Sequence, residues 1–168
     1  MITALIRTMA HRRGLFKRSW QSAADQGCNI IVHYGDKVSD YSYNLYCNSL
    51  KEEVTEGYFF FLDDDDFIID GAVARILPHL EENKALICQM LRNNRPKPNF
   101  PEIVRGRIGL PCMVLHHKHK LLADVVDEEY GDYQWIKRVT EQIRWKFVPI
   151  PLVNAGKRSN ENTIYRQF

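Results

Sequence analysis

The stretch FFFLDDDDFIIDG, residues 59–71, places four consecutive carboxylates, Asp63–Asp66, directly after a run of aromatic and aliphatic side chains. An apolar run of this length is typical of a buried strand. Carboxylates held close together repel one another and resist ionisation unless a cation lies among them. The stretch therefore predicts a core strand that ends at a site for a hard divalent ion with oxygen ligands.

Apolar runs of strand length recur along the chain, and segments with helical periodicity separate them. The expected strands are residues 2–6, 29–34, 58–62, 85–91, 111–116 and 145–150. The expected helices carry their apolar faces on Phe16, Trp20 and Ala23; on Tyr43, Cys47, Leu50 and Val54; on Val73, Ile76, Leu77 and Leu80; and on Trp135, Ile136, Val139 and Ile143. This alternation predicts an α/β fold with a mostly parallel central sheet that is flanked by helices on both faces.

The position of the acidic residues supports a binding site. Ligands of an open parallel sheet bind outside the carboxyl ends of its strands, which is where the third expected strand stops. If the chain stays extended, Asp63 and Asp65 point to one side of the sheet and Asp64 to the other. The alternative is a solvated acidic turn that also caps a helix beginning near Asp70.

Length and composition exclude several other classes of protein. The 168 residues, 45% hydrophobic and 26% charged, predict a single domain spanning 1–168. A formal net charge of +2 is too small to indicate a nucleic-acid-binding protein. The four cysteines form no C-x-x-C pair, and no apolar run approaches the roughly 20 residues of a transmembrane helix. We therefore expect a cytoplasmic protein without a transmembrane segment or a secretory signal.

One segment fits neither periodicity. Residues 92–109, RNNRPKPNFPEIVRGRIG, contain three prolines and two glycines over more residues than an ordinary connection needs. Such a loop is either disordered or functional.

The sequence EGYFFFLDDDDFI, residues 56–68, resembles the nucleotide-sugar-binding Asp-x-Asp segment of glycosyltransferases with the GT-A fold, most closely the family-two-like enzymes. The resemblance extends to ALIRT at 4–8, to NIIVHYGDKVSD at 29–40 and to the acidic motif GDYQWIKRV at 131–139. It implies a Rossmann-like nucleotide-sugar-binding fold. It also implies a metal-dependent, inverting glycosyltransferase that moves a sugar from a nucleotide-sugar to an acceptor hydroxyl. A UDP-sugar is the expected donor.

The resemblance implies roles for the acidic residues. Asp65 is the expected direct metal ligand, Asp63 is expected to contact the ribose or the metal, and Asp64 is expected to assist in donor binding. Mn²⁺ or Mg²⁺ suits these oxygen ligands better than Ca²⁺, which requires more of them.

The nucleoside end of the donor is expected to lie across the first two strand ends. The candidates there are Arg7, Thr8, Arg12 and Arg13 for phosphate or base, and Asp36 for a uracil or similar imide. Asn44 and Asn48, one helical turn apart, are candidates for the nucleoside, with a cap or a water-facing position as the alternative for Asn44. A solvated first helical turn is the alternative for Arg12, and a plain turn residue is the alternative for Asp36.

By the same resemblance, Asp132 is the expected catalytic base, with Glu129 as a second candidate. A positioned carboxylate that accepts the proton of an acceptor hydroxyl contributes about 10²–10⁴-fold to such a reaction. Asp132 as an ordinary cap of a helix amino terminus is the alternative, and the two roles are compatible. Lys157 and Arg158 are expected to close over the diphosphate as cationic donors, and a disordered tail is the alternative for them.

Two other functions remain open on the sequence. A nucleotidyltransferase shares the sheet and the metal but needs a glycine-rich turn after the first strand, and RTMAHRRG at 7–14 has a single glycine. A non-catalytic nucleotide-sugar-binding module needs the acidic cluster but not Asp132. A metal site at His116, His117 and His119 is disfavoured, because neighbouring residues of a strand face opposite sides.

Overall fold

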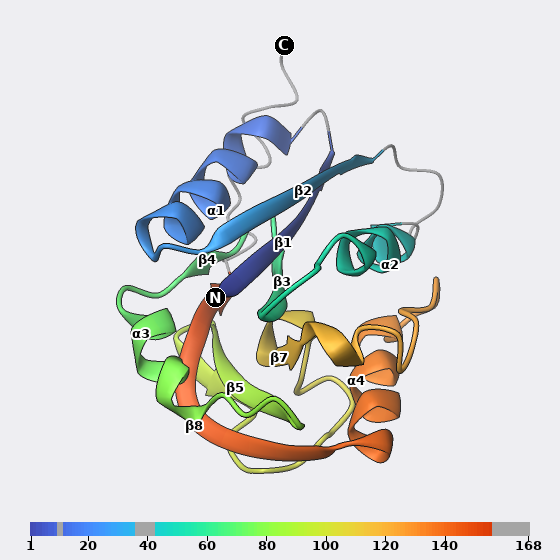
Figure 1. The fold of residues 1–168 in the computed structure, drawn as a ribbon. Coiled ribbons are helices and arrows are strands. Elements are labelled where there is room, and N and C mark those ends of the chain that lie inside the picture. The colour runs from blue at the N-terminus through green and yellow to red at the C-terminus, as the bar shows by residue number, and fades with distance from the viewer. Residues whose placement is uncertain (10–11, 36–42, 156–168) are drawn as a thin grey trace.

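A computed structural model of the chain describes residues 1–9, 12–35 and 43–155, with the backbone alone for residues 13 and 43–45 (Figure 1). The strands are β1 (Ile2–Met9), β2 (Asn29–Gly35), β3 (Tyr58–Asp63), β4 (Phe67–Ile68), β5 (Lys84–Arg92), β6 (Arg95–Lys97), β7 (Met113–His116) and β8 (Arg144–Ala155). The helices are α1 (Arg13–Asp25), α2 (Tyr43–Glu52), α3 (Ala72–Ile76) and α4 (Gly131–Gln142), with short 3₁₀ turns η2 (Leu77–His79), η3 (Leu110–Cys112) and η4 (His117–His119). All six expected strands are confirmed, and β4 and β6 are additional.

The strands form one mixed sheet in the order β2-β1-β3-β7-β5-β8-β4, with β6 paired to β5. β1 runs parallel to β2 and β3, and β5 runs parallel to β8. β7, however, lies between β3 and β5 and is antiparallel to both, and β4 is antiparallel to β8. The α/β class is confirmed, but the expected mostly parallel sheet is wrong. Continuous apolar strands show burial on both faces, and burial does not fix strand direction.

The two faces of the sheet carry different helices. Phe59 and Phe61 of β3 pack in one core cluster with α2 and α4, whereas Phe60 and Leu62 pack in the other cluster with α1 and α3. Figure 1 shows α1 and α2 on opposite sides of β1. Because side chains alternate along a strand, this arrangement also fixes the side toward which each residue at the end of β3 points.

Two helices differ from the expected pattern. In α1 the fully buried positions are Ser19 and Ala23, while Trp20 is 42% exposed, so the expected apolar face is wrong at Trp20. The third helix is shorter than expected. α3 ends at Ile76 and continues as the 3₁₀ turn η2, which contains Pro78. Proline lacks the N–H that the next turn of an α-helix requires.

The proline-rich segment is ordered at its start as a hairpin. β5 and β6 pair antiparallel, with Arg92 opposite Arg95, so only two residues connect them. Those residues, Asn93 and Asn94, both have positive φ angles, 53° and 59°. Two left-handed residues are what a tight type I′ hairpin turn requires, and asparagine tolerates that conformation better than most residues.

In the part of the chain that the structure describes, no helix combines the length and the apolar composition needed to cross a membrane.

Candidate active site

Strand pairing brings the first two charged residues of the site together. Arg7 and Asp63 are register partners at the carboxyl ends of β1 and β3. The guanidinium of Arg7 donates to Asp63 Oδ1 from Nε at 2.8 Å and approaches the same oxygen with Nη2 at 2.7 Å. Its Nη1 also lies 3.4 Å from Cys47 Sγ of α2. Arg7 is thus held on the α2 side of the sheet with its charge on the first carboxylate.

The chain turns immediately after Asp63. The N–H of Asp66 donates to the carbonyl oxygen of Asp63 at 3.1 Å and closes the turn. Ser19 of α1, which is fully buried, places its Oγ 3.1 Å from the carbonyl oxygen of Asp63 and 2.5 Å from that of Asp66. One hydroxyl therefore fastens both ends of the acidic turn to α1. The sequence analysis missed this residue, and a serine at the centre of an otherwise apolar helix face was the available signal.

Asp64 is the buried member of the cluster, with 2% of its side chain exposed. Thr8 donates to its Oδ2 at 2.8 Å, and Nη1 of Arg12 lies 2.9 Å from its Oδ1. Burial raises the pKa of Asp64 from 3.8 to about 6, against the opposing effects of Arg12 and Thr8. The structure therefore brings three predicted site residues, Thr8, Arg12 and Asp64, into one hydrogen-bonded group.

Asp65 is the more exposed neighbour, with 38% of its side chain exposed. Its Oδ2 lies 2.9 Å from Nη2 of Arg12, so that one guanidinium joins Asp64 and Asp65. An extended chain would have put Asp65 beside Asp63. The strand ends at Asp63 instead, and the turn places Asp65 with Asp64.

Asp132, the expected catalytic base, belongs to α4. It is the second residue of α4, and its Oδ1 accepts a hydrogen bond from the N–H of Tyr133 at 2.7 Å. A Cβ added to Gly109 would lie 3.4 Å from its Oδ2, so Gly109 leaves room beside this carboxylate. Burial raises the pKa of Asp132, the charge of Asp63 raises it further, and Arg7 opposes the rise. The charges of Asp63 and Arg7 thus have opposite effects on the pKa of the expected base.

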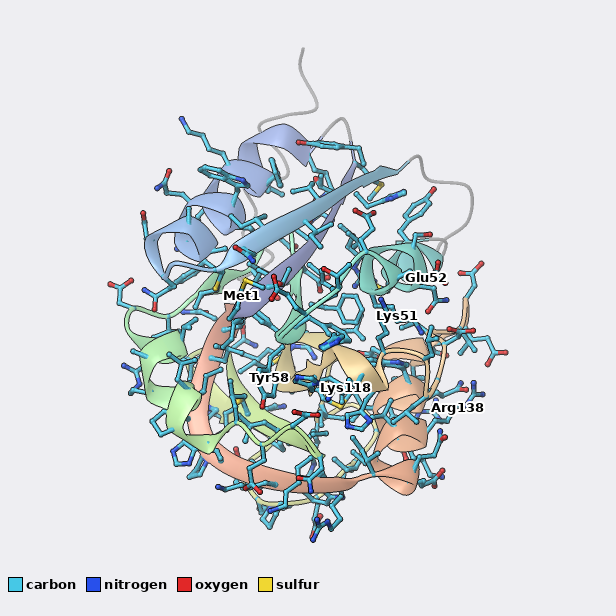
Figure 2. All side chains as sticks on the ribbon, viewed as in Figure 1. Met1, Lys51, Glu52, Tyr58, Lys118 and Arg138 are labelled. Carbon is cyan, nitrogen blue, oxygen red and sulfur yellow. The ribbon has the colours of Figure 1, made fainter. Side chains whose placement is uncertain are left out.

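Asn48 has a different environment. Its Nδ2 donates to the carbonyl oxygen of Val125 at 2.9 Å, and its Oδ1 accepts from the N–H of Val125 at 2.9 Å. One turn later, the fully buried Lys51 donates to the carbonyl oxygen of Ala123 at 2.5 Å and pairs with Asp124 at 2.6 Å. Figure 2 shows Lys51 between α2 and the segment that leads to α4. These contacts connect Asn48 to the segment that precedes Asp132, and none of them involves the carboxylate cluster.

Other predicted residues lie elsewhere. Asp36, Lys157 and Arg158 fall outside the residues that the structure describes. His116 ends β7 beside the amino end of β3, and His117 and His119 lie in η4. His117 Nδ1 lies 3.3 Å from the carbonyl oxygen of Gly57. Residues 1–9, 12–35 and 43–155 contain no group of three histidine, cysteine, aspartate or glutamate side chains arranged to hold a metal ion.

The carboxylates nevertheless suit a metal that is shared with a substrate. Mg²⁺ in phosphate-transfer sites is typically held by one or two carboxylates together with phosphate oxygens and water. Asp63 and Asp65 are the two partly exposed members of the cluster, at 32% and 38%. These residues supply oxygen ligands of the type that such a cation takes, and a bound diphosphate would have to supply others.

No family model matches the sequence, and no curated protein does. Solved structures match the fold. One of them is the structure of S. aureus TarS 1–349 in complex with UDP-GlcNAc. It aligns with a TM-score of 0.70 and 12% sequence identity, and the alignment covers 99% of this chain and 61% of that chain. The chain thus spans less than two thirds of the length of this TarS fragment.

A second match has the same length as this chain. It is a glycosyltransferase involved in the glycosylation of the major capsid of PBCV-1, with a TM-score of 0.63 at 10% identity over 99% of both chains. This chain has a glycosyltransferase fold. A197 from STIV also matches, with a TM-score of 0.53 at 10% identity over 88% of this chain and 81% of that chain. In this glycosyltransferase fold, the carboxylate cluster lies where the parallel strands β1 and β3 end.

Proposed function

We propose that this chain is a metal-dependent, inverting glycosyltransferase that moves a sugar from a nucleotide-sugar donor, a UDP-sugar, to an acceptor hydroxyl. The observation that carries the proposal is the group of carboxylates at the carboxyl end of β3, where Thr8 and Arg12 hold Asp64 and Arg7 pairs with Asp63. The glycosyltransferase fold supports it, since TarS structures with this fold hold UDP-GlcNAc and UDP.

The cationic residues of the cluster suit the donor. A guanidinium presents a planar set of N–H groups that matches phosphate oxygens as well as carboxylates. Arg7 and Arg12 stand on either side of the acidic turn, and Thr8 lies beside Arg12 at the end of β1. In our proposal these residues meet the diphosphate, while Asp36 binds the base.

Asp65 and Asp63 are the residues that would hold Mn²⁺ or Mg²⁺. Such an ion, when bound, supplies positive charge to the departing diphosphate. Asp64, which is buried and bonded to Thr8, holds the turn in place beneath them.

Asp132 serves as the general base in this proposal. A carboxylate is a better proton acceptor near neutral pH when its pKa is raised, and both burial and Asp63 raise the pKa of Asp132. Attack by the acceptor oxygen on the face opposite the leaving diphosphate inverts the anomeric centre in one displacement. A non-catalytic binding module would not need such a carboxylate. None of the four cysteines forms a disulfide, which suits a reducing cytoplasm.

Donor binding tests the proposal directly. UDP with Mn²⁺ at 100 times the dissociation constant is expected to stabilise the protein by about 2.7 kcal/mol in a thermal-shift experiment. Asp65→Asn is expected to remove this stabilisation, whereas the matched control Asp70→Asn, on an exposed residue, is expected to keep it. The proposal is wrong if UDP with Mn²⁺ produces no shift in the wild type and UDP-sugar is not hydrolysed.

A further inference from the structure

Arg12 links two carboxylates that the proposed function uses differently. It stands at the N-cap of α1, where its side chain makes no capping hydrogen bond. Its Nη1 contacts Asp64 and its Nη2 contacts Asp65, both at 2.9 Å. Arg12 therefore acts as a bridge between the buried carboxylate and the exposed one.

The two ends of this bridge are unequal. Asp64 is buried and also bonded to Thr8, so its carboxylate has a fixed position. Asp65 is 38% exposed and lies in the turn, and Arg12 itself is 28% exposed. The contact with Asp65 is consequently the one that solvent and a ligand can reach.

A guanidinium at this position opposes a free metal ion. The oxygen Oδ2 of Asp65, the proposed metal ligand, already pairs with a positive charge. A divalent cation on Asp65 would lie within a few ångströms of Arg12, where like charges repel strongly in a partly buried site. A diphosphate removes this conflict, because its oxygens accept the same paired N–H groups that the carboxylates accept.

We propose that Arg12 is an internal counter-cation that keeps Asp65 from binding a divalent ion until the donor diphosphate draws the guanidinium away. This inference rests on the proposed function and adds an order to it. The donor-free protein binds Mn²⁺ weakly, and the diphosphate both accepts Arg12 and exposes Asp65 to the ion.

Titration of the full chain with Mn²⁺ alone, followed by the EPR signal of free Mn²⁺, tests this role without any turnover. Arg12→Gln removes the charge, and Lys17→Gln removes one charge from an exposed position of the same helix as a matched control. Without nucleotide, Arg12→Gln is expected to bind Mn²⁺ about tenfold more tightly than the wild type, as loss of a nearby like charge requires. Lys17→Gln is expected to match the wild type. With UDP added, the wild type is expected to gain Mn²⁺ affinity and Arg12→Gln to gain less.

Equal Mn²⁺ affinity of Arg12→Gln and the wild type without nucleotide would overturn the inference, as would an equal gain in Lys17→Gln. Arg12→Lys provides a second variant, because a lysine keeps the charge but has no fork with which to span two carboxylates. Arg12→Lys is expected to bind Mn²⁺ with an affinity between those of the wild type and Arg12→Gln. An affinity equal to that of the wild type contradicts the idea that Arg12 must span both carboxylates. The two proposals can be told apart. Absence of UDP binding in every protein refutes the proposed function and the release of Arg12 by the diphosphate, whereas tighter Mn²⁺ binding by Arg12→Gln still supports the repulsion between Arg12 and the ion.

Discussion

The aspartates of the acidic turn have the same side chain, but those that face α1 and those that face α4 differ in burial and in their charged partners. On the α1 side, Asp64 is buried against Thr8 and Arg12. On the α4 side, Asp63 is 32% exposed and interacts with Arg7 and with Asp132. The α1 side therefore fixes the turn, and in the proposed function the α4 side presents a carboxylate to the substrate. Neighbouring aspartates differ in this way because β3 ends at Asp63 and the chain turns toward α1 at Asp64.

Asp132→Asn tests the α4 side with the largest expected effect. The amide cannot accept a proton, so the rate of sugar transfer or donor hydrolysis is expected to fall by about 10²–10⁴-fold while UDP affinity is kept. Glu141→Gln, on an exposed residue of the same helix, is the matched control. Full activity in Asp132→Asn, with loss in Glu129→Gln instead, would transfer the role of base to Glu129.

The pH dependence of the rate sharpens the same assignment. The base acts in its ionised form, and burial raises the pKa of Asp132. The rate is therefore expected to fall as the pH drops through this raised pKa, by about tenfold for each pH unit below it. A rate that stays constant down to the usual pKa range of an aspartate would contradict the assignment.

Asp64→Asn tests the α1 side through stability. The folded-state pKa of Asp64, about 6, exceeds the ordinary value of 3.8, so the folded protein resists ionisation of this group. The stability contribution of Asp64 is fully present below pH 3.8 and is lost as the pH rises through about 6. At about 1.4 kcal/mol for each pKa unit, the wild type loses up to about 3 kcal/mol by pH 8.

Urea unfolding at pH 4 and pH 8 measures this effect. The difference in unfolding free energy between Asp64→Asn and the wild type is expected to shift in favour of the variant by up to about 3 kcal/mol over this range. Asp70→Asn, on an exposed carboxylate, is expected to show no such shift. A pH-independent difference in Asp64→Asn would mean that this carboxylate is as well solvated as its neighbours.

Ser19→Ala has a smaller expected effect, on the attachment of the turn to α1. The variant leaves the buried carbonyl groups of Asp63 and Asp66 without their hydroxyl donor, which is expected to cost about 1–3 kcal/mol of unfolding free energy. Affinity for UDP with Mn²⁺ is expected to fall as well. Gln21→Ala, on an exposed residue of the same helix, is expected to stay within about 0.5 kcal/mol of the wild type. Unchanged stability in Ser19→Ala would show that α1 does not hold the turn.

Asn48→Ala is expected to have the smallest effect on donor binding and separates the site from its supporting structure. Loss of the two hydrogen bonds to the buried Val125 is expected to cost about 1–3 kcal/mol, measured by urea unfolding. UDP affinity is expected to change less than twofold. A large loss of UDP affinity without a loss of stability would support the nucleoside contact that the sequence predicts for Asn48.

Much of the fold follows from local sequence. The six apolar runs predict the six long strands because burial on both faces leaves a continuous apolar pattern. The β5–β6 hairpin was predictable in principle, since Asn93 and Asn94 suit a left-handed turn. The direction of β7 was not, because an antiparallel strand buried on both faces has the same apolar pattern as a parallel one.

By itself, the sequence determined that an apolar strand ends in four carboxylates and that Thr8, Arg12 and Asp132 are candidates to join them. These features are local, since they depend on residue type and on the alternation of a strand. Only the tertiary structure decided which charges meet. It placed Arg7 on Asp63, spread Arg12 over Asp64 and Asp65, and fastened the turn with Ser19. Such pairings join residues 44 to 56 positions apart, and they form because helices and strands pack around a common core, which no local pattern encodes.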